Sequence, residues 1–181
     1  MVSRLDETVR RTPASLSKAN QALGLLAWVL VTFTAAAIGA LASRDAPQFY
    51  AELVQPSWSP PASVFGPVWS VLYTLMAISV GWLWRQRGFA GARGALTLFA
   101  VQLAANALWS WLFFAWHHGA LAFAEVFVLW CLVLATVVAF QRKSALAAAL
   151  LYPYLAWTAF AAALTFTLWR LNPGVLGALV S

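Results

Sequence analysis

Polar and aromatic side chains recur at helical spacing inside two long apolar stretches of the chain. Gln102, Asn106 and Trp109 are spaced four and three residues apart, which places them on one stripe of a helix. Trp69 and Tyr73, four residues apart in an earlier stretch, share a helix face in the same way. Aromatic rings with one N–H or O–H each, together with carboxamides, are side chains suited to lining a ligand cavity between helices.

The amides also have a purely structural interpretation. In a membrane, carboxamides turned toward neighbouring helices form interhelical hydrogen bonds worth about 0.6 kcal/mol on average. A similar choice applies to Trp157 and Ala161, which lie four residues apart on one face. A large ring beside a small residue leaves room for a guest, but a small residue also permits close helix packing. The sequence leaves both interpretations open.

Other reactive residues are few and scattered. Glu125 is the only carboxylate inside an apolar run, and we expect it to form interfacial hydrogen bonds, since one acid makes neither an acid–base pair nor a metal site. His117 and His118 either ligate a haem iron or form a solvated loop pair. Cys131 has no partner for a disulfide. We therefore expect no metal site and no obligatory cofactor.

Composition identifies the class of protein that must position these residues. The chain is 63% hydrophobic and 9% charged, whereas soluble domains are about 45–50% apolar and about 25% charged. Continuous apolar runs of about 20 residues are typical of helices that cross a bilayer. The predicted fold is an all-α membrane protein, a five-transmembrane-helix bundle, with spans at about 22–42, 65–84, 95–116, 120–140 and 145–169.

Two short segments flank this predicted domain of residues 21–172. Residues 1–20 form a polar N-terminal extension and residues 173–181 a C-terminal tail. The net charge of +6 is not gathered into one patch with interleaved aromatics, so we expect no nucleic-acid partner.

The basic residues predict an orientation. With five spans, nine of the eleven Lys and Arg residues fall on the face that holds the N-terminus. The positive-inside rule then places the N-terminus in the cytoplasm, and the first loop and the C-terminus on the opposite face.

The first loop, about residues 43–63, is much longer than the other connections. It holds Trp58, Pro60 and Pro61, and the paired prolines stiffen it and end any preceding helix. Long ordered loops often serve as lids or binding elements, so this loop is a candidate lid.

Four sequence blocks in this order resemble the tryptophan-rich sensory protein and translocator protein family, the peripheral benzodiazepine receptors. The similarity runs from about residue 22 to 172. The blocks are Trp58-Ser59-Pro60-Pro61, Phe65-Gly66-Pro67-Val68-Trp69-Ser70-Val71-Leu72-Tyr73, Gln102-x-x-x-Asn106-x-x-Trp109-Ser110-x-x-Phe113-Phe114 and Pro153-Tyr154-Leu155-Ala156-Trp157-x-Ala159-Phe160-Ala161.

The resemblance implies a five-helix bundle, commonly a homodimer in the lipid bilayer, that binds porphyrins such as protoporphyrin IX in a cavity closed by the first loop. Some bacterial members are reported to degrade porphyrin in light, which makes Trp69 and Trp157 candidate catalytic residues. The lid would contain Trp58, Pro60 and Pro61. Carried over to this chain, the ligand-binding residues are Trp69, Tyr73, Gln102, Asn106, Trp109, Trp157 and Ala161.

Three positions depart from the family pattern. Ser63 stands where many members have an aromatic residue, which would thin the lid, and Thr165 replaces the usual Asn. Phe166 stands in place of the Tyr of a motif linked to cholesterol in mammalian members, and such motifs are weak even when complete. The sequence therefore gives no ground to expect sterol binding.

These observations favour a membrane tetrapyrrole-binding receptor or sensor. The alternatives are a light-dependent porphyrin-degrading enzyme that uses the same site, and a transporter of tetrapyrroles or other small molecules.

Overall fold

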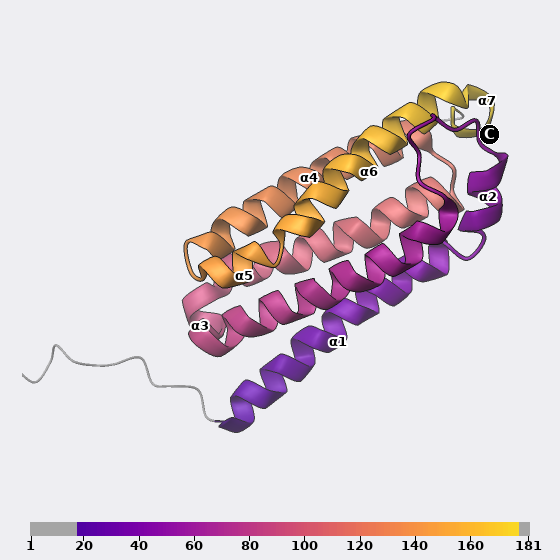
Figure 1. Ribbon diagram of the computed structural model, residues 1–181. Coiled ribbons are helices and arrows are strands. Elements are labelled where there is room, and N and C mark those ends of the chain that lie inside the picture. Colours follow the sequence, from indigo (N-terminus) through magenta and orange to yellow (C-terminus); the bar gives the residue numbers. More distant parts are fainter. Residues whose placement is uncertain (1–17, 178–181) are drawn as a thin grey trace, which may run out of the picture.

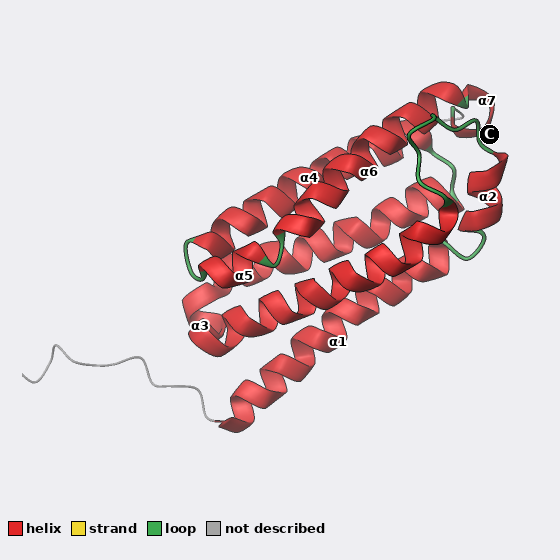
Figure 2. Ribbon diagram, viewed as in Figure 1, coloured by secondary structure: helices red, strands yellow, loops and turns green. Residues whose placement is uncertain are grey.

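A computed structural model describes residues 18–177 of the chain (Figure 1). Every regular element in this range is helical, and Figure 2 shows no strand among the described residues. The all-α prediction is confirmed. The helices are α1 (Lys18–Ala42), α2 (Ala46–Glu52), η1 (Ala62–Val64), α3 (Phe65–Ser110), η2 (Trp111–Ala115), α4 (Gly119–Gln141), α5 (Ala145–Ala149), α6 (Tyr152–Leu171) and α7 (Pro173–Leu176).

Four of the described helical segments are long and apolar enough to cross a membrane. They have mean hydropathies between 1.5 and 2.5, and large apolar side chains on them are exposed around the outside of the bundle. Such a surface is stable only against lipid. The segments are α1, the continuous stretch Ala62–Ala115, α4 and the stretch Ala145–Leu171.

Helix α3 consists of two antiparallel limbs. Its 46 residues would extend about 69 Å if straight, more than twice the thickness of a bilayer core. The helix is instead interrupted at Gly88 (φ 59°, ψ −173°) and Ala92 (φ −135°, ψ 19°), and the chain reverses there (Figure 1). Gly88 takes a positive φ that a residue with a Cβ rarely adopts. We call residues 65–87 the first limb and 93–110 the second limb.

Helix α1 lies along the outside of α3 (Figure 1). Its N-terminal half is held closely, because the Trp84 ring covers Gly24 so tightly that a Cβ there would come within 2.2 Å of three of its atoms. Farther along, the residues buried against α3 are small: Thr32, Ala35, Gly39 and Ala42. These side chains fill little space, so the C-terminal half of α1 leaves room beside α3.

On the other side of α3, helices α4 and α6 form a dense layer. Val126, Leu129 and Val133 of α4 are almost completely buried. Phe140 of α4 stacks on Phe99 of α3, with ring centroids 5.9 Å apart. This packed layer holds the second limb of α3 in place.

The two ends of the membrane domain differ from the sequence prediction. The predicted span 145–169 is broken into α5 and α6, since Pro153 lacks the N–H that a continuous helix needs and is found in the first turn of α6. The predicted tail begins with α7, whose Leu176 is buried. Residues 1–17 of the predicted N-terminal extension lie outside the described range, and α1 begins at Lys18.

Candidate ligand cavity

A cavity of about 630 Å³ lies between α1, both limbs of α3 and the first loop. None of the described residues that line it is charged. Half of the residues that line it belong to α3 and η2: Phe65, Gly66, Trp69, Ser70, Tyr73, Thr74, Asn106, Trp109, Ser110 and Phe114. The others are Phe33, Ala36, Gly39, Ala40 and Ser43 at α1 and Ala46, Pro47, Tyr50, Ala62 and Ser63 in the first loop.

A buried hydrogen-bond network supports one wall of this cavity. The Tyr73 hydroxyl donates to Asn106 Oδ1 at 2.5 Å, and Asn106 Nδ2 donates to the Tyr154 hydroxyl at 3.1 Å. The Tyr154 hydroxyl in turn donates to Gln102 Oε1 at 2.8 Å. The second limb of α3 is thus joined to α6 through Asn106 and Gln102, and to the first limb through Tyr73, so both amides form hydrogen bonds between helices.

The same network leaves capacity for a ligand at Asn106. A carboxamide has two N–H donors and two lone pairs on its oxygen, and one of each is used by Tyr154 and Tyr73. Asn106 and Tyr73 line the cavity, whereas Gln102 does not. Asn106 therefore combines a packing role with a position on the cavity wall, and Gln102 supports it from behind.

Aromatic rings form the wall that separates this cavity from α6. Trp69 and Trp109 lie with ring centroids 6.2 Å apart, and Trp109 stacks on Phe113 at 6.0 Å. Trp109 is 7% exposed and its Nε1–H has no hydrogen-bond partner among the described residues. We define the aromatic wall as the five residues Tyr50, Phe65, Trp69, Trp109 and Phe114, which line both this cavity and a smaller hollow behind it.

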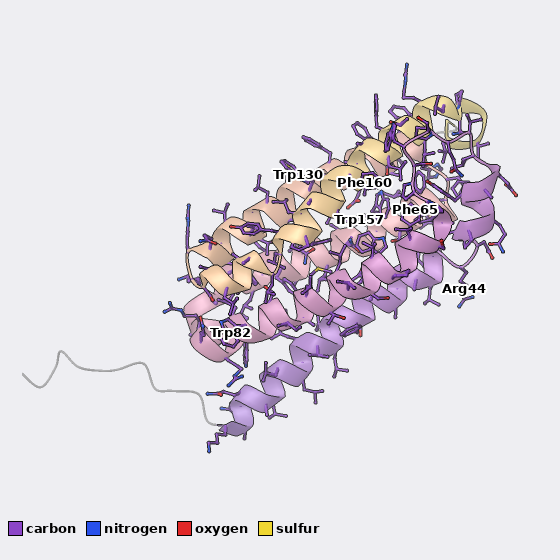
Figure 3. The ribbon with its side chains drawn as sticks, viewed as in Figure 1. Arg44, Phe65, Trp82, Trp130, Trp157 and Phe160 are labelled. Atoms are coloured by element: carbon purple, nitrogen blue, oxygen red, sulfur yellow. The ribbon has the colours of Figure 1, made fainter. Side chains whose placement is uncertain are left out.

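The smaller hollow has a volume of about 20 Å³, enough for roughly one water molecule. Trp157 and Ala161 of α6 line this hollow and do not line the large cavity. The seven residues named as ligand-binding are thus divided, with Trp157 and Ala161 at the small hollow, and the third wall of the large cavity is formed by α1. Little space remains on the α6 side because the Trp157 ring fills it (Figure 3). The centroid of this ring lies 6.1 Å from that of Phe65 and 5.2 Å from that of Phe160.

The first loop covers one end of the cavity and is fastened at several points. The Tyr50 hydroxyl donates to the Pro60 carbonyl at 3.1 Å. Asn172, just beyond α6, accepts from the Val54 N–H at 2.8 Å and donates to the Val54 carbonyl at 2.9 Å. It also donates to the Leu168 carbonyl at 2.9 Å. One buried amide thus ties the loop to the end of α6.

The predicted lid residues lie in this loop but do not face either hollow. Trp58 is 49% exposed and packs edge-on against Phe160 at 5.8 Å. Pro60 and Pro61 direct the chain into η1 without lining the cavity. Ser63 does line it, which agrees with the expectation that a small residue there thins the lid.

Sequence reasoning missed the whole α1 side of the cavity, and it also missed three polar side chains that support the site: Tyr50, Tyr154 and Asn172. The sequence did contain an indication for Tyr154, because it lies three residues before Trp157 in an apolar helix and carries a hydroxyl that needs a partner when buried. Asn172 had none, since its partner Val54 is 118 residues away and contributes only backbone atoms.

The remaining reactive residues lie outside the cavity. His117 stacks on Phe49 of α2 with ring centroids 4.1 Å apart, and so supports the first loop. Glu125 lines neither hollow, and one of its carboxylate oxygens is buried without a partner in the described structure. Within residues 18–177 no three His, Cys, Asp or Glu residues gather where they could hold a metal ion.

Fold and cavity together define a helical integral membrane protein with an aromatic cavity beneath an ordered loop. Residues 27–170 match the model of the TspO/MBR family, and the chain belongs to that family. The resemblance deduced from the four sequence blocks is confirmed.

Relatives from distant organisms are similar over most of the chain. The tryptophan-rich protein TspO of Chlorobaculum tepidum is 37% identical over 72% of this chain and 83% of its own length. Protein CrtK of Rhodobacter capsulatus is 40% identical over 77% of this chain and 87% of its own. The human translocator protein is 39% identical over 72% of this chain and 78% of its own.

Proposed function

We propose that this protein is a membrane receptor or sensor that binds a tetrapyrrole, such as protoporphyrin IX, in the large cavity. The observation that supports this proposal is the combination of volume and lining. About 630 Å³ lies within the range of about 300–1,000 Å³ typical of small-molecule sites. The aromatic wall offers faces on which a flat ring system stacks. A relative from Cereibacter sphaeroides, 38% identical over 80% of this chain, is named a tryptophan-rich sensory protein, which agrees with a sensory role.

In this proposal the polar edge of the ligand binds Asn106 and Tyr73, and Trp109 contributes its ring to the aromatic wall. Asn106 has one donor and one lone pair left after its contacts with the two tyrosines. Trp69 stacks against the ring. Trp157 and Ala161 act indirectly by supporting Phe65 and Trp69 from the far side of the aromatic wall.

The proposal includes a topology of five spans in a homodimer. The first limb of α3, residues 65–87, is as long as the 23 residues of α4, and the second limb reaches the same length when it is continued by η2 to Ala115. Each is therefore long enough to cross the bilayer once. The distribution of Lys and Arg places the N-terminus in the cytoplasm and the first loop outside it. Labelling of single cysteines at residues 86 and 57 from the two sides of the membrane tests this orientation, in a C131S background.

A titration with protoporphyrin IX in detergent tests binding. We expect saturable quenching of Trp fluorescence with one site per chain. The Trp109→Phe variant replaces the indole on the cavity wall with a smaller ring and should weaken binding. Trp130→Phe is the matched control, because Trp130 lies on α4 and lines neither hollow. Absence of quenching, or equal effects of the two variants, would reject the proposal.

Light-dependent oxidation of the bound porphyrin by dioxygen is a second candidate function at the same site. It is favoured by Trp69, an oxidisable ring that lies on the cavity wall and 6.2 Å from Trp109. Trp157 lies behind the wall, so Trp69→Phe should reduce the rate more than Trp157→Phe. The rate is measured by illuminating the complex in air and following the Soret absorbance of the porphyrin. If the porphyrin is lost no faster than in detergent alone, the protein is not a porphyrin-degrading enzyme.

Transport is a third candidate, in which the cavity holds the ligand during its passage. Counter-flow of labelled porphyrin in liposomes distinguishes transport from binding alone.

A further inference from the structure

Basic residues gather at the end of the bundle opposite the first loop. Arg85, Arg87 and Arg93 lie around the turn between the two limbs of α3, and Arg142 and Lys143 lie between α4 and α5. All five side chains are exposed. Arg87 Nη2 donates to the Lys143 carbonyl at 3.0 Å, which joins the two turns directly. We call this group of five residues the basic end, and Figure 1 shows both turns at the same end of the molecule.

Carboxylates in the described part of the chain lie elsewhere. Asp45 precedes α2 and Glu52 is its last residue, so both lie at the first-loop end of the bundle. Glu125 lies within α4. The first-loop end thus carries two acids against two bases, Arg44 and Arg170. The basic end has five cations. Between residues 53 and 177 the only acidic residue is Glu125, which lies within α4. Lys18, the first residue of α1, lies toward the same end (Figure 1), so the two ends differ in net charge by six among the described residues.

Apolar and aromatic side chains adjoin the basic end on the bundle surface. Trp82, labelled in Figure 3, lies one turn before Arg85. It is 38% exposed, and Phe89 within the turn is 53% exposed. Leu146 of α5 is 52% exposed just after Lys143. Exposed aromatic rings next to cations are typical of the headgroup level of a bilayer. The basic end consequently meets the membrane where phosphate groups lie.

From this arrangement we infer that the basic end is a binding surface for anionic phospholipid headgroups. Guanidinium groups form paired hydrogen bonds with phosphate oxygens, and clusters of Lys and Arg at the end of a membrane span attract anionic lipids. The bond from Arg87 to the Lys143 carbonyl keeps Arg142 and Lys143 beside the α3 turn, so that one lipid headgroup can contact both turns. This surface is separate from the ligand cavity, whose described lining residues are uncharged.

Native mass spectrometry of the full chain, titrated with phosphatidylglycerol or phosphatidylcholine in detergent, tests the inference. We expect the wild type to retain phosphatidylglycerol at least tenfold more tightly, with the preference decreasing as salt increases. The triple variant R93Q/R142Q/K143Q should lose this preference, since each cation near an anionic surface contributes about fivefold. Arg87 is left unchanged because it makes a structural hydrogen bond.

The control R44Q/R170Q removes two cations from the first-loop end and should leave the preference unchanged. The variant R93K/R142K keeps the positive charge and should therefore retain most of the preference for phosphatidylglycerol. Equal retention of the two lipids by the wild type, or equal losses in the triple variant and the control, would overturn the inference. Stronger binding of heparin than of phosphatidylglycerol micelles would also overturn it, since it would identify a soluble polyanion as the partner. Unchanged helical content by circular dichroism in phosphatidylcholine shows that the triple variant is folded.

Discussion

The two sides of the aromatic wall contain very different amounts of empty space. On the α1 side the cavity measures about 630 Å³, and on the α6 side the hollow measures about 20 Å³, although five residues line both. The difference lies in the side chains opposite the wall. Helix α1 presents Ala36, Gly39 and Ala40, whereas α6 presents Trp157 and Phe160. Because interiors pack closely, the volume of the facing side chains decides where a cavity remains.

The comparison also explains why the same network serves both sides. Tyr154 donates and accepts hydrogen bonds on the packed side, and Asn106 extends from that network to the open side. The packed side thus holds the wall rigid while the open side provides the space. Substitutions on one side of the aromatic wall should therefore affect stability and ligand binding differently from substitutions on the other side.

Opening the packed side should have the largest effect. Trp157→Ala removes a ring that contacts Phe65 and Phe160, and we expect a loss of about 3–5 kcal/mol in the free energy of unfolding because the vacated space does not collapse fully. Thermal unfolding in detergent measures the change. Trp116→Ala, at a site 51% exposed, is the control and should cost much less. Similar losses in the two variants would show that the α6 side is not the rigid support.

Filling the open side should abolish binding without a comparable loss of stability. Ala36→Trp places a large ring in the cavity, and we expect porphyrin affinity to decrease about 100-fold, which corresponds to about 2.7 kcal/mol. Ala37→Trp is the control one residue along, since Ala37 is exposed and does not line the cavity. Fluorescence titration gives both affinities. If the two variants bind equally well, the ligand does not occupy this cavity.

Removing one hydroxyl from the network should produce an intermediate effect. Tyr154→Phe leaves the Gln102 oxygen and an Asn106 N–H buried without their partner, and we expect a loss of about 1–3 kcal/mol in stability. The control Tyr152→Phe removes a hydroxyl from an exposed residue and should change stability by less than about 0.5 kcal/mol. Chemical unfolding monitored by circular dichroism compares the two. A neutral Tyr154→Phe would mean that the amides find other partners.

Loosening the first loop should have the smallest effect on stability and a visible one on ligand release. Asn172→Ala removes the two hydrogen bonds that hold Val54 to the end of α6, and a third to the Leu168 carbonyl, and we expect porphyrin to dissociate about tenfold faster. Gln86→Ala, an exposed amide at the other end of the bundle, is the control. Stopped-flow displacement measures both rates. Equal rates would show that the loop does not retain the ligand.

Several features of the fold could be predicted because they depend on local chemistry. The long apolar runs require a membrane, and the chain reverses at Gly88, in the segment between two predicted spans. The break before Pro153, by contrast, divides a run that was predicted as one span. The stripe of Gln102, Asn106 and Trp109 could be placed on one helix face, because a periodicity of 3.6 residues is a property of the backbone alone. The residues of this stripe are all buried, as a polar stripe in a membrane must be.

The sequence by itself thus determined that the protein is a helical membrane protein of a recognisable family, with polar groups turned inward. Only the tertiary structure decided which helix closes the cavity. The small residues of α1 are also what a lipid-facing helix contains, and Tyr154, Trp157 and Ala161 all lie near one face of α6. The rotation and separation of packed helices determine which of them reaches the network and which fills space. These quantities depend on contacts between residues far apart in the chain, such as Asn172 with Val54, and no local pattern encodes them.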